Sequence, residues 1–164
     1  MTWQLCSERD PRALAIVDGT GRFVAHGAHY SRRTPGVPRD GHGGFVGVGR
    51  SLVLLTDDAV WGVVLGQDPR GVLRWRNMMF RNLGAELSSS LIRAATVRTF
   101  AWWLRKYREL PSTPLRTEID TRAVRGPHFG ACYKAAGWVR CEGAPSSARR
   151  RPYMLYFTPG SRAM

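Results

Sequence analysis

The segment Phe80-Arg81-Asn82-Leu83-Gly84-Ala85-Glu86-Leu87-Ser88-Ser89-Ser90 decides the predicted fold, because the hydrophobic pattern changes its period across it. An apolar, aromatic-rich run, residues 72–80, leads into this segment. After it, apolar residues recur at steps of three and four, as on one face of a helix: Leu87, Leu91, Ala94, Val97, Ala101 and Leu104. The segment is therefore predicted to be a turn between a strand and a long helix, with Glu86 and the serines in the first helical turn.

The predicted start of this helix has the properties of an anion site. The first backbone N–H groups of a helix have no intrahelical partners, and the helix dipole is positive there. Phosphate groups commonly bind at such ends. We therefore expect the turn and the first helical residues to bind an anionic group.

The spacing of Arg81, Gly84 and a hydrophobic residue before the helix resembles the pyrophosphate-binding motif of the GNAT superfamily of N-acetyltransferases. In that superfamily the strand splays from its neighbour, and the turn amides cradle the pyrophosphate of coenzyme A. The resemblance implies a cofactor, acetyl-CoA or a related acyl or glycyl donor, held by Arg81, Gly84, Ala85, Glu86, Leu87, Ser88 and Ser89. Glu86 replaces the last glycine of the motif, and a carboxylate is electrostatically unfavourable beside a pyrophosphate.

The remaining pattern predicts one α/β domain over residues 1–164 with a mixed central sheet. Antiparallel strands are expected at residues 45–48, 51–55, 59–66 and 72–80, with a tight turn at 56–58. The long helix ends before Pro111, and further strands are expected at 115–120, 138–142 and 152–158. The strands on either side of the long helix should lie parallel, with helices on both faces of the sheet. Near the N-terminus, residues 13–17 and 22–25 could form a hairpin, or residues 23–30 a short helix.

A second short segment adds to the resemblance. In the GNAT superfamily a short helix carries a tyrosine and ends in Gly-Phe or Gly-Trp, and Tyr133 and Gly137-Trp138 match this pattern. Gly137 also suits a helix C-cap. The resemblance implies that Tyr133 protonates a departing thiolate, with packing as the alternative role. Asp120 closes the strand before this helix, and ligands of open α/β sheets bind outside such strand ends.

The charge balance points to a polyanionic partner. The 164 residues include 25 Lys and Arg against 12 Asp and Glu, a formal net charge of +13. A GC-rich coding genome explains arginine in place of lysine, but it does not explain the excess of basic over acidic residues. Domains this basic attract nucleic acids, and arginine suits phosphate. DNA is therefore the expected partner, with candidate contacts in three basic loops: Arg32, Arg33, Arg122, Arg125, Arg149, Arg150 and Arg151.

Four features follow one another along the chain: His29-Tyr30, Phe80-Arg81-Asn82 followed by Leu87-Ser88-Ser89, Asp120, and residues 132–138. Taken together, they resemble the phage Mom proteins. Mom proteins are GNAT-like enzymes that convert adenine in phage DNA to an N6-carbamoylmethyl form, which protects the DNA from restriction.

The Mom resemblance implies a role for each matching residue. His29 and Tyr30 would lie beside the target base, and Asp120 would align the adenine amino group or accept its proton. Tyr133 would serve the donor side, and Arg81 would bind the cofactor phosphate or orient the strand. The alternatives are an acetyl-CoA-dependent N-acetyltransferase acting on a protein or small-molecule amine, and a non-catalytic basic domain that binds nucleic acid.

The remaining composition bears on location and assembly. No apolar stretch has the roughly 18 residues of a transmembrane helix, and the N-terminus lacks the apolar region of a signal peptide, so we expect a cytoplasmic protein without membrane contact. The Mom resemblance implies that the protein is phage-encoded and acts in a bacterial host cell. Cys6, Cys132 and Cys141 lack the spacing of a disulfide framework or a zinc site, and the four histidines lack ligand spacing. The Trp102-Trp103 pair is expected in the core, with a homodimer face as the alternative.

Overall fold

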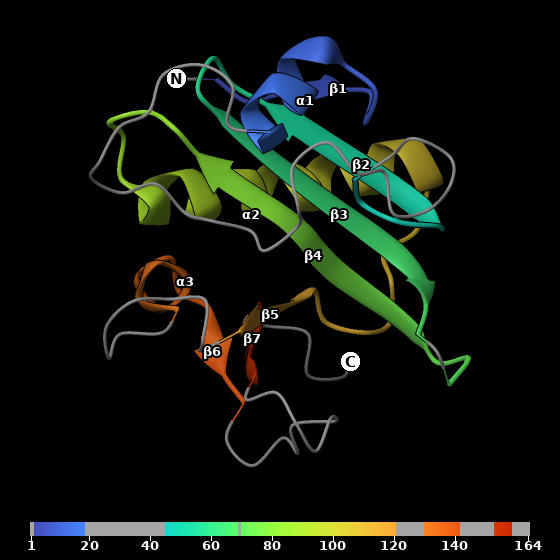
Figure 1. The fold of residues 1–164 in the computed structure, drawn as a ribbon. Coiled ribbons are helices and arrows are strands. Elements are labelled where there is room, and N and C mark those ends of the chain that lie inside the picture. Colours follow the sequence, from blue (N-terminus) through green and yellow to red (C-terminus); the bar gives the residue numbers. More distant parts are fainter. Residues whose placement is uncertain (1, 19–44, 69, 121–129, 142–152, 159–164) are drawn as a thin grey trace.

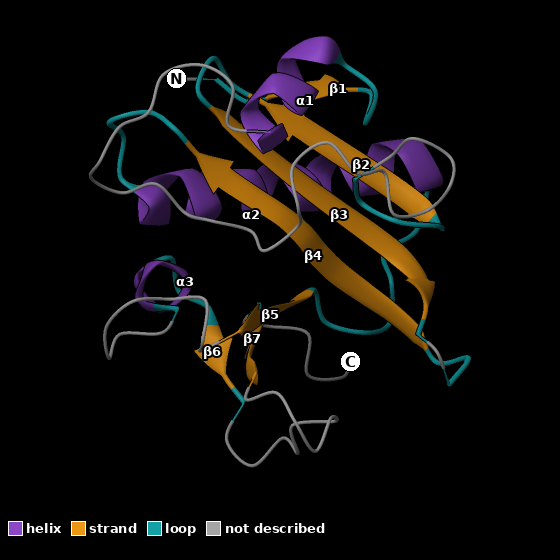
Figure 2. Ribbon diagram, in the orientation of Figure 1, coloured by secondary structure: helices purple, strands orange, loops and turns teal. Residues whose placement is uncertain are grey.

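The computed structural model describes residues 2–18, 45–68, 70–120, 130–141 and 153–158. Within these residues the chain forms a seven-stranded mixed sheet in the order β1-β2-β3-β4-β5-β7-β6, with helices on both of its faces (Figures 1 and 2). The strands are β1 (Gln4–Cys6), β2 (Arg50–Leu55), β3 (Ala59–Gln67), β4 (Leu73–Asn82), β5 (Arg116–Asp120), β6 (Val139–Arg140) and β7 (Tyr153–Phe157). The helices are α1 (Pro11–Asp18), α2 (Ser88–Tyr107) and α3 (Ala131–Ala135). The predicted mixed α/β architecture is confirmed.

β2, β3 and β4 form the predicted antiparallel meander, and β1, which was not predicted, pairs antiparallel with β2. The turn between β2 and β3 is held by Thr56, whose hydroxyl accepts a hydrogen bond from the Ala59 amide at 2.9 Å. The strand predicted at residues 45–48 is wrong, because these residues form bends that lie across the face of β3. Gly62 makes room for this crossing, since a Cβ at this position would lie 2.3 Å from Val46 Cγ1. Residues 45–48 therefore pack onto the sheet instead of extending it.

The N-terminal hairpin predicted from residues 13–17 is also wrong, because these residues belong to α1. Asp10 begins the helix: its Oδ1 accepts a hydrogen bond from the Arg12 amide at 2.9 Å, and its carbonyl accepts one from Leu14 at 3.0 Å. Pro11 occupies the first helical position, where a missing N–H is harmless. The apolar residues have helical spacing and are buried against the sheet: Ala13, Ile16 and Val17. Residues 22–25 and 23–30 lie outside the described residues.

The long helix α2 follows β4 as predicted, but it is rotated relative to the prediction. Glu86 precedes the helix and is not in its first turn. The residues that face the sheet are Leu91, Ile92, Ala95, Thr99 and Trp103, whereas the residues predicted to do so are exposed, with the exception of Leu91: Leu87, Ala94, Val97, Ala101 and Leu104. The buried Trp61 indole donates a hydrogen bond to the Thr99 hydroxyl at 2.9 Å, so a polar residue takes part in the buried face.

The two faces of the sheet carry separate cores, which we call the α2 side and the α1 side. On the α2 side, Trp61 packs edge-on against Phe80 and Trp138, and Trp103 on the inner face of α2 is fully buried. Trp102 is half-buried beneath Arg105. The α1 side has a smaller core in which α1 packs on β3 and β4. The core position predicted for the tryptophan pair is thus confirmed for one of the two.

A bulge in β4 decides which residues face each side. Gly62 is paired with Met79, but Val63 is paired with Asn77, so Met78 has no partner in the register. The alternation of β4 side chains between the two faces of the sheet therefore shifts by one residue at Met78. Before the bulge the odd-numbered residues, such as Asn77, face the α2 side, and after it the even-numbered ones, such as Phe80, do.

The C-terminal strands are joined to the meander by a short contact. β4 and β5 are parallel, as predicted, but only Arg76↔Arg116 and Asn77↔Thr117 are in register. Beyond these two pairs the described strands separate, β4 continuing to Asn82 and β5 to Asp120 (Figure 1). β5 pairs instead with β7 along its whole length.

The short helix α3 ends as the sequence predicted. Gly137 has φ +92°, and its amide donates to the Lys134 carbonyl at 2.9 Å. The Trp138 amide donates to the Tyr133 carbonyl at 2.9 Å, which completes a glycine-type C-cap. The cap turns the chain into β6, so Trp138 enters the core on the α2 side.

Candidate functional site at the β4–β5 junction

Asn82 organises the turn between β4 and α2. Its side chain is fully buried, and Nδ2 donates to the Glu86 carbonyl at 2.7 Å and to Ser88 Oγ at 3.3 Å. Its Oδ1 accepts a hydrogen bond from the Gly84 amide at 2.9 Å. One amide side chain therefore connects the end of the strand to the start of the helix. Asn82 was not among the predicted site residues, although asparagine in a strand-to-helix turn is a common signal for such bonds.

The turn presents backbone amides at the start of α2. Leu87 at the N-cap has extended φ and ψ angles, and no side chain caps the helix. Among the described residues, the amides of Ala85, Ser89 and Ser90 donate no hydrogen bond. These donors lie at the positive end of a 20-residue helix, so the arrangement suits an anion bound by main-chain groups.

The side chains of the predicted cofactor residues contribute less to such a site. Arg81 points to the α1 side, where Nη1 donates to the Val17 carbonyl at 2.6 Å near the end of α1. Gly84 packs against the β2–β3 turn, since a Cβ there would lie 2.8 Å from Asp58 Cβ. The Glu86 and Leu87 side chains are exposed. Any phosphate bound here would be held by the backbone, with the carboxylates of Asp58 and Glu86 opposing it.

A buried polar cluster lies where β4 and β5 separate. Tyr133 of α3 donates its hydroxyl proton to Asn77 Oδ1 at 2.7 Å, and Thr117 Oγ1 donates to the same oxygen at 3.4 Å. Asn77 Nδ2 in turn donates to the carbonyls of Gly62 at 3.0 Å and Met79 at 2.9 Å. The bulge turns the Met79 carbonyl into reach, so the β4 irregularity and the cluster belong together. Asn77 and Thr117 were not predicted as site residues.

Tyr133 is held in its protonated form. Its ring is buried between Phe80, Trp138 and Tyr156, and burial raises the pKa of the hydroxyl far above its usual range. A hydroxyl with so high a pKa keeps its proton at neutral pH and acts as a hydrogen-bond donor. The predicted site tyrosine therefore lies at the β4–β5 junction, with Asn77 as an acceptor of its proton.

The other predicted residues are distributed unevenly. Asp120 ends β5 as predicted, three positions beyond the last residue of β5 that is in register with β4, and it pairs with Tyr153 of β7. Because β4 and β5 are parallel, the turn at residues 82–88 and Asp120 lie toward the same end of the separating strands. The remaining candidates lie outside the described residues: His29, Tyr30, Arg32, Arg33, Arg122, Arg125, Arg149, Arg150 and Arg151.

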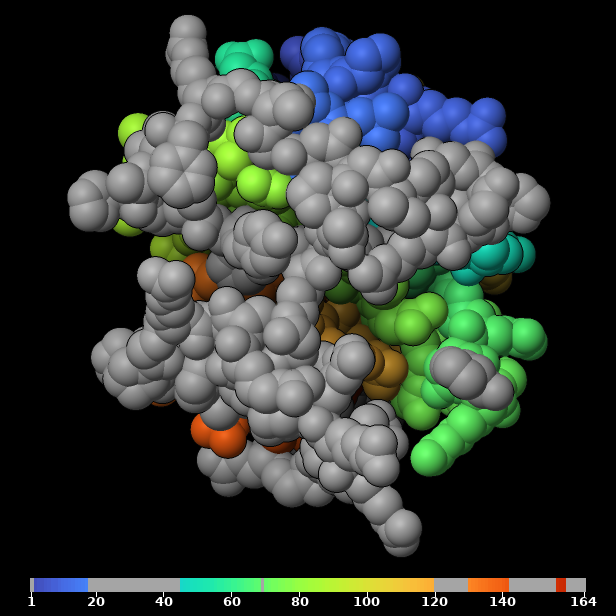
Figure 3. Space-filling model, viewed as in Figure 1, coloured from blue at the N-terminus to red at the C-terminus, as the bar shows by residue number. Residues whose placement is uncertain are grey.

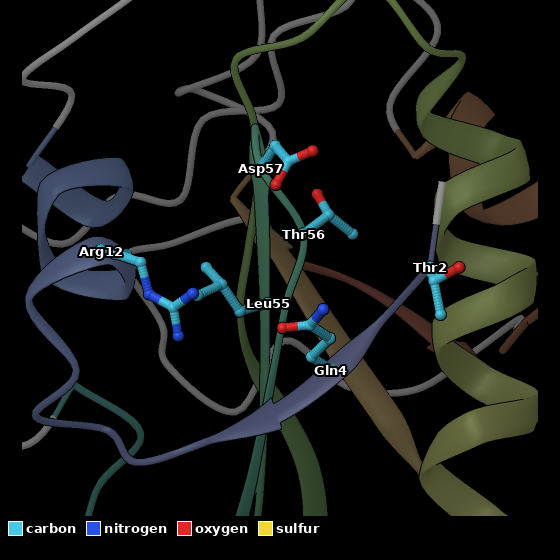
Figure 4. Close-up of a pocket in the computed structure, with 6 residues that line it drawn as sticks. All are labelled: Thr2, Gln4, Arg12, Leu55, Thr56 and Asp57. Carbon is cyan, nitrogen blue, oxygen red and sulfur yellow. The ribbon is translucent and has the colours of Figure 1, made fainter.

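A pocket of about 170 Å³ lies at the opposite edge of the sheet, between β1, α1 and the β2–β3 turn (Figure 4). Its lining residues are Thr2, Gln4, Arg12, Leu55, Thr56 and Asp57. The Arg12 guanidinium is paired with Asp10 at 2.8 Å. None of the predicted site residues lines this pocket.

The cysteines are thiols, and burial raises the pKa of both Cys6 and Cys132 to about 11. Neither thiol is therefore ionised at neutral pH. Among the described residues, no helix has both the length and the apolar character needed to cross a lipid bilayer.

No family model, no curated protein and no solved structure matches this chain. The assignment of a function therefore depends on the geometry and the charge of the protein itself.

Proposed function

We propose that this protein is a GNAT-like transferase that binds a coenzyme A-type donor where β4 and β5 separate, and that it modifies the N6 amino group of adenine in DNA, as Mom proteins do. One observation carries the proposal. The parallel strands β4 and β5 are joined by only two register pairs. β4 then leads into a turn with backbone amides that donate no hydrogen bond to the described residues, and from there into the long helix α2. This combination is what the resemblance of residues 80–90 to the GNAT motif implies.

The backbone of the turn fits a diphosphate better than its side chains do. The amides of Ala85, Ser89 and Ser90 are available as donors at the positive end of α2. Asp58 and Glu86 would weaken the binding of an anion, so we expect lower affinity for coenzyme A than a glycine at position 86 would give. When bound, a glycyl thioester of coenzyme A would supply an activated acyl carbon, with the coenzyme A thiol as the leaving group. A glycyl group on N6 has the same atoms as the carbamoylmethyl group, so the proposed product would form from it by rearrangement.

Residues of the junction would position the donor and the acceptor. Tyr133, protonated and hydrogen-bonded to Asn77, offers a fixed hydroxyl where the strands begin to separate. Asp120 ends β5 toward the same end as the turn, where a carboxylate could align an amine or take its proton. The exocyclic amine of adenine is a weak nucleophile, so it needs such a base.

The charge supports DNA as the acceptor. The formal net charge is +13. Cations in excess attract a nucleic acid at long range and bind its phosphates. A paired base is inaccessible within the duplex, so the enzyme would act on a flipped or single-stranded adenine.

Nucleoside mass spectrometry tests the proposal. Plasmid DNA is isolated from cells that express the wild-type protein, Asp120→Asn, or Asp57→Asn, a matched change in an exposed turn. We expect a carbamoylmethyl-adenine species from the wild-type and Asp57→Asn proteins, and at least a tenfold reduction for Asp120→Asn. Unmodified DNA from well-expressed wild-type protein would contradict the DNA-modification proposal.

An acetyl-CoA-dependent N-acetyltransferase acting on a protein or small-molecule amine is the second candidate, because the separating strands and the turn support it equally. Donor binding is tested by thermal unfolding with and without acetyl-CoA. Ser89→Asp should abolish the acetyl-CoA-induced increase in Tm, since a carboxylate stabilises a helix start but repels a pyrophosphate. Ala101→Glu, an equal charge change on the exposed face of α2, should retain it. Acetyl-CoA binding without DNA modification would favour this second candidate.

A further inference from the structure

The α1 side of the β4–β5 junction carries three arginines close together. Arg76 and Arg116 are register partners on the two parallel strands, and Arg74 lies two residues before Arg76 on the same face of β4. Arg76 and Arg116 directly precede Asn77 and Thr117, so the arginines occupy the opposite face from the Tyr133 cluster. The short contact that joins the two halves of the sheet is therefore also a concentration of positive charge.

The carboxylates around this cluster do not balance it. Arg74 Nε lies 3.2 Å from Asp68 Oδ2, and Arg116 Nη2 lies 2.8 Å from Glu118 Oε1. Arg76 makes no hydrogen bond or ion pair with the described residues. The Nε atoms of Arg76 and Arg116 are buried without a hydrogen-bond partner. Within the part of the chain that the structure describes, three guanidinium groups thus share two carboxylates, and two of their buried N–H donors have no acceptor.

This arrangement is unfavourable unless an anion compensates it. Like charges directly opposite each other on adjacent strands are destabilising, and a buried donor without a partner costs about 1–3 kcal/mol. Burial lowers the pKa of Arg116, and repulsion from Arg74 and Arg76 adds to this. Arginine remains charged in proteins, so the strain is not relieved by loss of a proton.

The cluster reaches the surface. The side chains of Arg74, Arg76 and Arg116 are all partly exposed, and α1 packs on other residues of β3 and β4. In the space-filling view, coloured atoms of β4 and of the segment that enters β5 lie next to each other on this face, below α1 (Figure 3). A group that approaches from solvent on this face would meet the guanidinium groups.

We propose that Arg74, Arg76 and Arg116 form a phosphate-binding site. Guanidinium groups bind phosphate oxygens by paired, charge-assisted hydrogen bonds, and a phosphate would supply the charge that Arg76 lacks. The phosphate belongs either to the backbone of a nucleic acid or to a small phosphorylated molecule. If the phosphate belongs to a nucleic acid, the site is a contact that holds the DNA, and this inference rests on the proposed function. If it belongs to a small molecule, the site is independent of the proposed function.

Two binding measurements on the full chain test the site. Fluorescence anisotropy with a labelled DNA duplex, over a series of salt concentrations, measures binding of the phosphodiester backbone. The Tm in the presence of inorganic phosphate or ADP measures binding of a small phosphate. The variants are Arg76→Gln, Arg76→Lys, which keeps the charge but loses the planar fork, and Arg98→Gln as a control on the exposed face of α2.

If the site holds DNA, Arg76→Gln should weaken duplex binding about tenfold and reduce the salt slope by about 1, more than Arg98→Gln does. If it holds a small phosphate, the phosphate- or ADP-dependent increase in Tm should disappear in Arg76→Gln and remain in Arg98→Gln. Arg76→Lys should give an intermediate value in whichever measurement responds. Equal behaviour of Arg76→Gln and Arg98→Gln in both measurements would overturn the proposal.

The outcomes separate this site from the proposed function. Loss of binding in Arg76→Gln with no adenine modification in cells would support the phosphate site and contradict the proposed reaction. Adenine modification with unchanged binding in Arg76→Gln would support the reaction and overturn the phosphate site.

Discussion

The two sides of the β4–β5 junction are built from alternate residues of the same strands, yet they differ in every physical property. On the α2 side, Asn77, Thr117 and Tyr133 are buried, uncharged and joined by hydrogen bonds. On the α1 side, Arg76 and Arg116 are charged, partly exposed and incompletely paired. One side of this short contact therefore contributes stability through hydrogen bonds, whereas the other retains positive charge that the described residues do not balance and that the proposed phosphate site would use.

Asn77→Leu should give the largest loss of stability. The substitution removes the acceptor of the Tyr133 hydroxyl and the donor to two buried carbonyls, so we expect a decrease of about 3 kcal/mol in the free energy of unfolding. Chemical denaturation measures this change. A loss below about 1 kcal/mol would mean that the hydrogen bonds of the α2 side contribute little, and the proposed contrast between the two sides would fail.

Alkaline pH should weaken the α2 side next. Burial raises the pKa of Cys132 from 9.0 to about 11, so the native state holds this proton more tightly than the unfolded chain does. The resulting stability is complete below about pH 9 and is lost as the pH rises toward about 11, a change on the order of 2 kcal/mol. Cys132→Ala should flatten the decline in stability over this interval, as measured by denaturation at each pH. An unchanged slope would show that Cys132 is not desolvated.

Tyr133→Phe should have a smaller effect, about 1 kcal/mol, because Asn77 keeps its bonds to the two carbonyls and to Thr117. The free energy of unfolding from denaturation measures the loss. Under the proposed function, adenine modification should fall more than stability does, since the hydroxyl would position the donor. Full modification by Tyr133→Phe would assign the tyrosine to packing alone.

Arg76→Gln should change stability least, within about 0.5 kcal/mol and in the stabilising direction, because it removes a repulsive pair with Arg116. A thermal melt in phosphate-free buffer provides the measurement. A marked destabilisation would show that the α1 side is also structural, and the contrast would be lost.

The sequence predicted the elements around residues 80–90 well, because the change from a strand pattern to a helical period is a local signal. The parallel pairing of β4 and β5 followed from the helix between them. The buried face of α2 was predicted wrongly, because the alanines of this helix are compatible with either face. The hydrogen bond between Trp61 and Thr99, which are 38 residues apart in the chain, helps to fix which face is buried, and the helical pattern alone does not contain it. The prediction for residues 13–17 missed α1, because it did not take the Asp10-Pro11 pair as a helix start.

The candidate site was predictable in part. Tyr133 and Asp120 lie in the predicted elements, since a glycine cap and a strand end mark their positions. Arg81 was expected to bind a phosphate or to orient the strand because its position matches a motif, and the structure turns its side chain toward the end of α1. Asn77, Arg74 and Arg76 could not be assigned to a face, because the alternation of β4 changes at a bulge that has no signature in the sequence. Their neighbours Thr117 and Arg116 could not be found either, because the register of β4 with β5 depends on only two pairs.

That bulge has a consequence for insertions and deletions. Met78 is half-buried and has no register partner, so replacing it with another apolar side chain should be tolerated. Deleting it would leave the other side chains of β4 on their present faces, because Asn77 and Met79 would become neighbours and already pair with the neighbouring residues Val63 and Gly62. The deletion would instead remove the bulge that brings the Met79 carbonyl to the Asn77 side chain. The extra residue in β4 therefore serves the position of one backbone carbonyl, and its loss should weaken the Asn77 cluster without reversing the faces of the strand.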